Sequence, residues 1–153
     1  MCTREEFTLL LSVTKAMAQH FMDSTKELAG SFDLTLPYPP SCNHAWKKGA
    51  NGRMYLDPRV EVFRAQVFAA VADLRTKKTI SSEPIACDCA VMVELNKSDR
   101  RRRDIDNPMK QLLDALTFAK VWNDDSQVQI MLTFFGRNKR HGSCNVLVCP
   151  LEV

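Results

Sequence analysis

Residues 85–95 form the clearest strand pattern in the chain, and the segments that follow them limit the fold further. One face of this strand would carry Ile85, Cys87, Cys89, Val91, Val93 and Leu95. Such alternation is typical of a strand with one buried face. A helical pattern over residues 108–120 comes next, with Asn107 as its expected N-cap and Gln111 on its expected outer face. Two more strands, roughly 127–135 and 143–150, close the chain. The sequence therefore predicts a sheet with a helix packed on it.

The first half of the chain supplies the remaining elements. Residues 32–36 alternate as a strand that the Pro37–Ser41 turn ends, and a helix begins at Asp57-Pro58. Residues 3–29 have the periodicity of one long helix. Its apolar stripe could pack on the domain, pair with a partner or lie partly loose, and we expect it to pack. That stripe comprises Phe7, Leu10, Val13, Met17 and Phe21. We therefore expect an α+β fold, a mixed β-sheet with packed helices in the order β-α-β-α-β-β after an extra N-terminal helix.

The bulk composition is that of an ordinary globular protein of 153 residues, with a net charge of only +3. We divide the chain into an N-terminal helical extension, residues 1–30, and one domain, residues 31–153. Six cysteines occur without a CxxC spacing, so we expect them to be reduced and buried, as in a cytoplasmic protein. No stretch is long enough to span a membrane, and the first residues lack a signal-peptide pattern. We expect neither a membrane partner nor a small-molecule cofactor.

A run of four arginines, Arg100–Arg103, leads directly into Asp104 and Asp106, and Lys110 follows one helical turn later. Arginines bind phosphate oxygens, and neighbouring carboxylates can hold Mg²⁺. If this piece is extended, both carboxylates face the same side. The pattern therefore indicates a phosphate-binding site next to a metal site. Lys110 could stabilise charge on the phosphate or make only ordinary helix ion pairs, and its residue type does not decide between the two.

A second acidic pair, Asp124-Asp125, follows the predicted helix. It could be a turn that begins a strand, or one of its residues could add the third carboxylate that a metal site needs. A helix over residues 108–120 would be about 20 Å long, and the return from Val121 would carry Asp125 only part of the way back. A second copy of the chain could instead bring its Asp125 to the first acidic pair. The hypothesis is a metal site assembled across a homodimer.

Residues 42–56 mix basic and aromatic side chains in a predicted irregular loop or loose hairpin. They include His44, Trp46, Lys47, Lys48, Arg53 and Tyr55. This mixture suits a contact with nucleic acid. A solvated loop with Trp46 in the core is an equal alternative.

Taken together and in order, these segments resemble the RusA family of Holliday junction resolvases, found in bacteria and their phages. Leu36-Pro37-Tyr38-Pro39-Pro40-Ser41-x-Asn43 is similar to the family's opening strand and proline turn. The arginine run with Asp104-x-Asp106-Asn107-x-x-Lys110 is similar to its acidic and lysine core. Asp114-Ala115-Leu116 and Trp122-x-Asp124-Asp125-x-Gln127-Val128 complete the pattern. Residues 1–30 have no counterpart in the family's short members, so they are either an added helix or the result of a start codon assigned too early.

The resemblance implies a Mg²⁺-dependent endonuclease, with Mn²⁺ as a substitute, that acts as a homodimer on four-way junction DNA in recombination and repair. It implies that Asp104, Asp106 and Asp125 are the metal-binding catalytic acids and Lys110 the catalytic lysine, with Asp124 as a lesser candidate. The candidate DNA contacts are Arg101, Arg102, Arg103, Lys47, Lys48 and Asn43.

Two other functions stay open on the residues alone. One is a Mg²⁺-dependent nucleotide pyrophosphohydrolase, which would also need several acids and basic residues. The arginine run argues against it, because one small substrate needs fewer phosphate contacts than a duplex. The other is a junction-DNA-binding protein without catalysis, in which the acids make only structural pairs.

Overall fold

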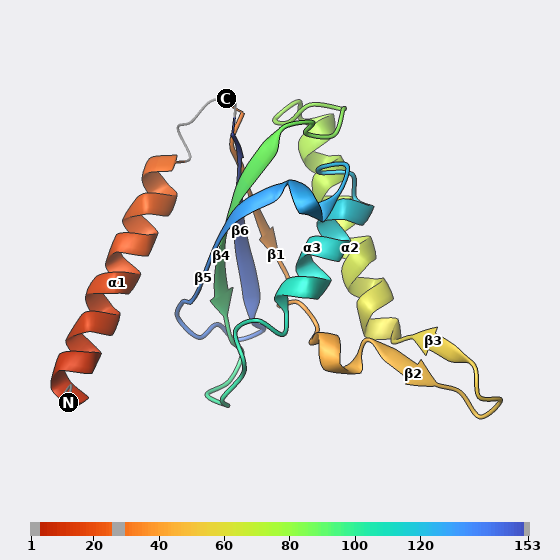
Figure 1. Ribbon diagram of the computed structural model, residues 1–153, viewed down its shortest axis with the longest axis horizontal. Coiled ribbons are helices and arrows are strands. Elements are labelled where there is room, and N and C mark those ends of the chain that lie inside the picture. The colour runs from red at the N-terminus through yellow and green to blue at the C-terminus, as the bar shows by residue number, and fades with distance from the viewer. Residues whose placement is uncertain (1–3, 26–29, 152–153) are drawn as a thin grey trace.

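The computed structural model describes residues 4–25 and 30–151, and its elements follow the predicted order (Figure 1). The helices are α1 (Arg4–Thr25), α2 (Pro58–Thr76) and α3 (Met109–Phe118). The strands are β1 (Phe32–Leu36), β2 (Trp46–Lys48), β3 (Met54–Leu56), β4 (Asp88–Asn96), β5 (Val128–Phe135) and β6 (Ser143–Leu151). Two single-turn 3-10 helices are η1 (Cys42–His44) and η2 (Asp125–Gln127). The α+β prediction is confirmed, with the β2–β3 hairpin as the addition between β1 and α2.

The main sheet has the strand order β1-β6-β4-β5. Strand β6 pairs antiparallel with both β1 and β4, whereas β4 and β5 run parallel. A parallel pair needs a crossover connection, and the segment from β4 through α3 to η2 supplies it. The two acidic pairs of the sequence therefore flank α3, one before it and one after it.

Helices α2 and α3 cover one face of the sheet, and the core lies between them and β4. The strand pattern is confirmed for Cys89, Val91, Val93 and Leu95, which are fully buried. The strand is shorter than predicted at its start, because it begins at Asp88 and leaves the half-buried Ile85 and Cys87 outside it. Its opposite face is not fully open, since Met92 is also buried. One face of α2 is also buried: Val60, Phe63, Val67 and Val71. Its start is as predicted, since the Asp57 carboxylate accepts a hydrogen bond from the Arg59 backbone at 2.9 Å. Each large apolar side chain buried in this way contributes roughly 1.5–3 kcal/mol.

Cysteine burial follows the prediction at three positions of the sheet. Cys89, Cys144 and Cys149 are buried, and burial raises the pKa of Cys89 to about 11. Cys42 and Cys87 are half-buried, and Cys2 lies outside the described residues. A buried thiol of raised pKa behaves as a small apolar side chain.

Three details of α3 differ from the prediction. The helix spans ten residues, fewer than 108–120 would give. Asn107 was expected as the N-cap, but Pro108 occupies that position and provides no side-chain cap. The Asn107 amide instead donates to Asp104, which is a stronger, charged acceptor. Gln111, expected on the outer face, is buried because α3 packs against α2 as well as the sheet.

The N-terminal helix α1 lies at one side of the molecule, away from α2 and α3 (Figure 1). The predicted packing of its apolar stripe is wrong where the side chains are described. Val13, Met17 and Phe21 are exposed, and α1 buries Ala18 instead. Thr3 and residues 26–29, also predicted to be helical, lie outside the described residues, as do the side chains of Phe7 and Leu10. No helix in the described part of the chain is long and apolar enough to cross a membrane.

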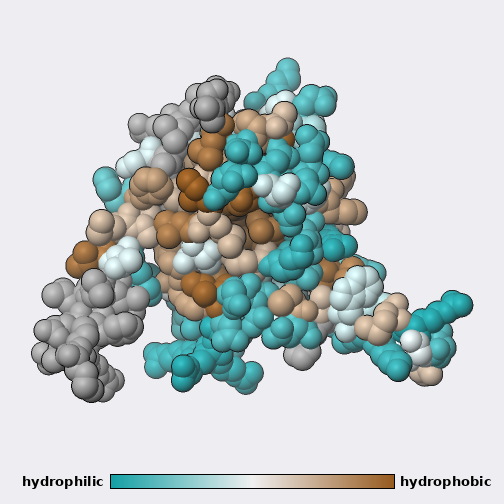
Figure 2. Space-filling model, viewed as in Figure 1, coloured by the Kyte–Doolittle hydropathy of each residue, from teal (hydrophilic) through white to brown (hydrophobic). Residues whose placement is uncertain are grey.

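Residues 42–56 form η1 and a short antiparallel hairpin in which Lys47 pairs with Tyr55. The hairpin projects from the body of the protein at the start of α2 (Figure 1). Trp46 is 62% exposed, so the alternative that places it in the core is wrong. Figure 2 shows hydrophilic side chains gathered over the loop that precedes α3, and a mixture of hydrophilic and more apolar side chains over the hairpin.

Candidate active site

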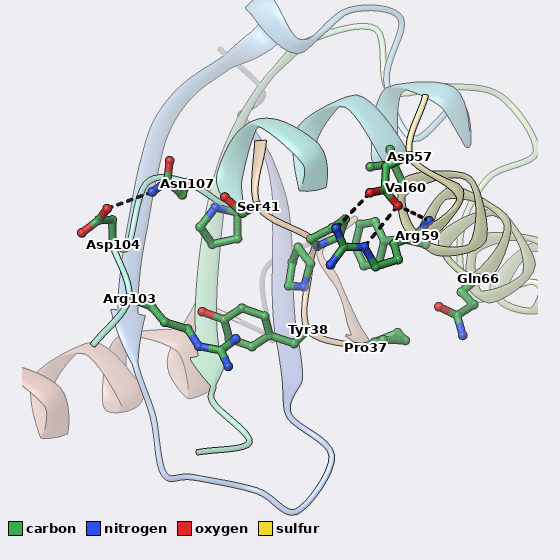
Figure 3. Close-up of a pocket in the computed structure, with 14 residues that line it drawn as sticks. Pro37, Tyr38, Ser41, Asp57, Arg59, Val60, Gln66, Arg103, Asp104 and Asn107 are labelled. Atoms are coloured by element: carbon green, nitrogen blue, oxygen red, sulfur yellow. Dashed lines mark hydrogen bonds and ion pairs between the residues drawn. The ribbon is translucent and has the colours of Figure 1, made fainter. Parts of the chain in front are cut away.

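The arginine run belongs to the loop between β4 and α3, and its last member, Arg103, has two side-chain contacts. Its Nη2 donates to Asp99 Oδ2 at 2.9 Å, and its guanidinium lies 5.2 Å from the centre of the Tyr38 ring. The backbone hydrogen bond from Arg101, together with Arg103, lowers the pKa of Asp99. This stacked, ion-paired arrangement orients a guanidinium at the edge of the proline turn (Figure 3).

Asp104 and Asp106 follow Arg103 on this exposed loop. Asp104 Oδ2 accepts a hydrogen bond from Asn107 Nδ2 at 3.0 Å. The Asp106 carboxylate has no partner among residues 4–25 and 30–151, although its backbone carbonyl accepts from Met109 N at 2.9 Å. Carboxylate oxygens open to solvent are suitable ligands for Mg²⁺, so the donor chemistry of the pair fits this cation.

The second acidic pair is held by a dense set of hydrogen bonds around η2. Asp124 caps η2, since its Oδ1 accepts from Ser126 N at 2.9 Å. Gln127 Oε1 accepts from the backbone of Asn123 and Asp124. Its Nε2 donates to the carbonyls of Ile85 and Cys87 at 3.0 and 2.8 Å. The sequence reasoning missed Gln127 as an anchor, but the spacing Asp124-x-x-Gln127 is a capping-box signal that could have found it.

Lys110 lies between Asp114 and Asp125. Its Nζ is 2.8 Å from Asp114 Oδ1 and 3.3 Å from Asp125 Oδ2. These hydrogen bonds, the one to Asp114 foremost, raise the pKa of Lys110 and keep it protonated. Asp125 therefore lies closer to the start of α3 than the predicted helix length indicated. The helix is shorter than predicted, and the long side chain of Lys110 reaches to the Asp125 carboxylate.

The acids do not all meet within one chain. Among the residues that the structure describes, no three His, Cys, Asp or Glu side chains are grouped closely enough to hold one metal ion. The structure thus brings Asp125 to Lys110, but it does not join Asp125 to Asp104 and Asp106 in one three-carboxylate cluster.

Comparison with known proteins gives the family. Residues 37–144 match the family model described as endodeoxyribonuclease RusA. The chain belongs to the RusA family. The resemblance seen in the sequence is thereby confirmed, and the matched segment contains both acidic pairs, Lys110 and the β2–β3 hairpin.

Curated RusA proteins are similar to this chain. Those named crossover junction endodeoxyribonuclease RusA from Shigella sonnei (strain Ss046) and Escherichia coli (strain K12) are each 34% identical to it. The protein of that name from Enterobacteria phage 82 has the same identity. Each match spans 98 residues, 64% of this chain and 77% of the relative. Membership of the RusA family implies, in general terms, use of a divalent metal and binding to branched DNA.

The predicted DNA contacts of this RusA-family domain lie in two exposed places. Arg101, Arg102 and Arg103 are on the loop before α3. Asn43 is on η1, and Lys47 and Lys48 are on β2. Lys47 Nζ also forms a 3.0 Å ion pair with the buried Asp57, which holds Arg59 as well. Arg59 was missed because a lone arginine in the first turn of a helix carries no specific sequence signal.

Proposed function

We propose that this protein resolves Holliday junctions by introducing paired nicks into four-way junction DNA, in a Mg²⁺-dependent reaction of recombination and repair. The observation that carries the proposal is the position of Asp104 and Asp106. Both carboxylates stand open on a loop directly after the arginine run, in a chain that belongs to the RusA family. The relatives named crossover junction endodeoxyribonucleases support the same substrate.

The metal would be held by Asp104 and Asp106 of one subunit and the partner subunit's Asp125, with Asp124 as the lesser candidate. Mg²⁺ bound there, or Mn²⁺ in its place, would act as a Lewis acid on the scissile phosphate. Arg103, fixed by Asp99 and Tyr38, would hold the phosphate in position. Lys110, which stays protonated, would stabilise the negative charge that grows during cleavage.

A homodimer is part of the proposal because the acids are not grouped within one chain. Strand β5 is an edge of the sheet, and its Ile130 and Met131 are exposed, 57% and 47% respectively. Exposed apolar side chains on an edge strand are a surface that a second subunit can cover. A dimer would thus both cover this apolar surface and complete the metal site.

The domain boundaries and the compartment belong to the same proposal. The family match begins at residue 37, after α1, which supports a helical extension over residues 1–30 and an endonuclease domain over residues 31–153. Relatives from bacteria and from a phage support action in the bacterial cytoplasm, or in the host cytoplasm for a phage protein.

The decisive experiment compares a synthetic four-way junction with a linear duplex of the same sequence, each with and without Mg²⁺. We expect selective binding of the junction in both buffers and cleavage only with Mg²⁺. Junction binding without cleavage in either Mg²⁺ or Mn²⁺ would instead indicate a non-catalytic binding protein. Release of pyrophosphate from a nucleotide, without junction binding, would indicate a pyrophosphohydrolase.

A further inference from the structure

A cavity of about 520 Å³ opens beside Asp104, between the proline turn and the start of α2 (Figure 3). Arg103 and Asp104 stand on one side of it, and Arg59 and Gln66 stand on the other. The wall between them is largely apolar and includes Pro39, Val60 and Phe63. A volume of this size is within the roughly 300–1,000 Å³ range of small-ligand pockets.

The side of the cavity away from Asp104 carries a fixed cation. Asp57 is 1% exposed and accepts two side-chain hydrogen bonds from Arg59, from Nε at 3.1 Å and from Nη2 at 2.9 Å. Lys47 Nζ is 3.0 Å from the same carboxylate. The Arg59 and Lys47 contacts hold the pKa of Asp57 well below its usual range, so the buried group stays ionised.

This cluster is suited to binding an anion. One carboxylate faces two cations, which leaves an excess of positive charge. Arg59 uses one edge of its guanidinium on Asp57, and its Nη1 has no acceptor in the described part of the chain. A guanidinium held on one edge and free on the other is arranged to bind a phosphate oxygen.

The residues next to Arg59 on the same face of α2 indicate that the cavity can bind a base as well as a phosphate. Arg59, Phe63 and Gln66 follow one another at intervals of four and three residues, so they share one face of the helix. Arg59 and Gln66 are exposed on that face, whereas Phe63 is only 3% exposed and belongs to the apolar wall of the cavity. A cation, an apolar wall and an amide match the phosphate, the ring and the hydrogen-bonding edge of a nucleotide.

We propose that this cavity binds one unstacked nucleotide of the cleaved strand, with Arg59 on its phosphate and Gln66 at the edge of its base. The proposal rests on the proposed function, because Asp104 at the rim places this nucleotide next to the scissile phosphate. Asp57 is a positioning residue that aims Arg59. A base inside a duplex is stacked and paired, whereas a base at a branch point ends a stack and costs less to extrude. The cavity therefore contributes to the preference for a junction.

Single abasic nucleotides test the proposal through binding alone. A set of junctions carries one abasic nucleotide at each successive position around the nick, and affinity is measured without divalent metal. We expect one position, directly beside the nick, to lose affinity by about tenfold, because the missing base no longer fills the cavity. Gln66→Trp fills the cavity and should abolish this positional difference. Equal losses at all positions, or a positional difference that survives Gln66→Trp, would overturn the proposal.

A second pair of variants tests the phosphate contact. Arg59→Gln should weaken junction binding and lower the slope of log affinity against log salt by about one unit. Lys77→Gln removes the same charge from the other end of α2 and should leave the slope unchanged. An unchanged slope in an Arg59→Gln protein with a wild-type unfolding temperature would exclude the contact. If the wild-type protein bound the junction no better than the duplex, the proposed function itself would be refuted. If it preferred the junction but no abasic position lowered its affinity, only the nucleotide-binding role of the cavity would be refuted.

Discussion

The two acidic pairs that flank α3 are held in opposite ways. Around Asp124 and Asp125, the cap of η2, the Gln127 amide and the Lys110 ammonium engage the carboxylates or their backbone. Around Asp104 and Asp106, a single amide from Asn107 is the side-chain partner within the described ranges. One pair is therefore fixed by the fold, and the other is left with free oxygens.

This difference separates structural acids from candidate metal ligands. Asp124 uses its carboxylate to cap η2, so its role in the fold is already accounted for. The carboxylate oxygens of Asp104 and Asp106 are therefore the ones left available to the metal ion that we propose. Asp125, held by Lys110 at the surface, is the member of the second pair that is available to complete a site.

The largest expected effect comes from the free pair. Asp106→Asn should abolish junction cleavage in Mg²⁺ and preserve junction binding, because the amide keeps the shape and loses the charge that holds a cation. Gel-shift and cleavage assays on the same junction measure both. Asp33→Asn, an exposed change on β1, serves as the control with wild-type cleavage. Retained cutting by Asp106→Asn would remove this residue from the site.

The next comparison lies within the fixed pair. Asp125→Asn should abolish cleavage, whereas Asp124→Asn should cleave at close to the wild-type rate because asparagine caps a helix about as well as aspartate. Single-turnover cleavage rates of the two variants decide between them. If Asp124→Asn were the inactive variant, the assignment of the two acids would have to be exchanged.

The anchor of η2 predicts a change in stability. Gln127→Ala leaves the part-buried carbonyls of Ile85 and Cys87 without their donor and should lower the free energy of unfolding by about 1–3 kcal/mol. Urea denaturation measures the loss. Within the described residues, the exposed Gln129 side chain donates only to the Ser126 carbonyl, so Gln129→Ala should change stability by no more than about 0.5 kcal/mol. Equal effects of the two substitutions would show that Gln127 is not a special anchor.

The smallest expected effect is at the arginine run. Arg103→Ala should weaken junction binding moderately and lower the salt slope by about one unit. Titrations at several salt concentrations measure it, with Lys77→Ala as the control on an exposed lysine far from the loop. A slope equal to that of the wild type would mean that Arg103 does not contact a phosphate.

Local patterns in the sequence were sufficient for most of the framework. The alternation over residues 85–95 identified the buried face of β4, and Asp57-Pro58 marked the start of α2, because both signals depend on neighbours in the chain. The prediction of Asn107 as the N-cap of α3 was wrong. The side chain of Asn107 donates to the charged carboxylate of Asp104, and a local sequence pattern does not show which partner such a side chain will take.

Long-range contacts account for what the sequence could not provide. Gln127 reaches carbonyls some 40 residues earlier in the chain, and the strand pairing that brings them together is set by the whole sheet. The cavity beside Asp104 likewise combines the proline turn, α2 and the loop before α3. The exposure of Trp46 and the burial of Gln111 both follow from how the elements pack.

A mixed dimer of an Asp104→Asn chain and an Asp125→Asn chain tests the divided site most directly. The two chains carry different affinity tags, and the doubly tagged dimer is assayed on a junction in Mg²⁺. If the acids meet across the interface, one of the two sites keeps all its carboxylates, so the mixed dimer should nick one strand while each parent homodimer is inactive. A mixed dimer that binds the junction and nicks no strand would contradict a site shared between subunits.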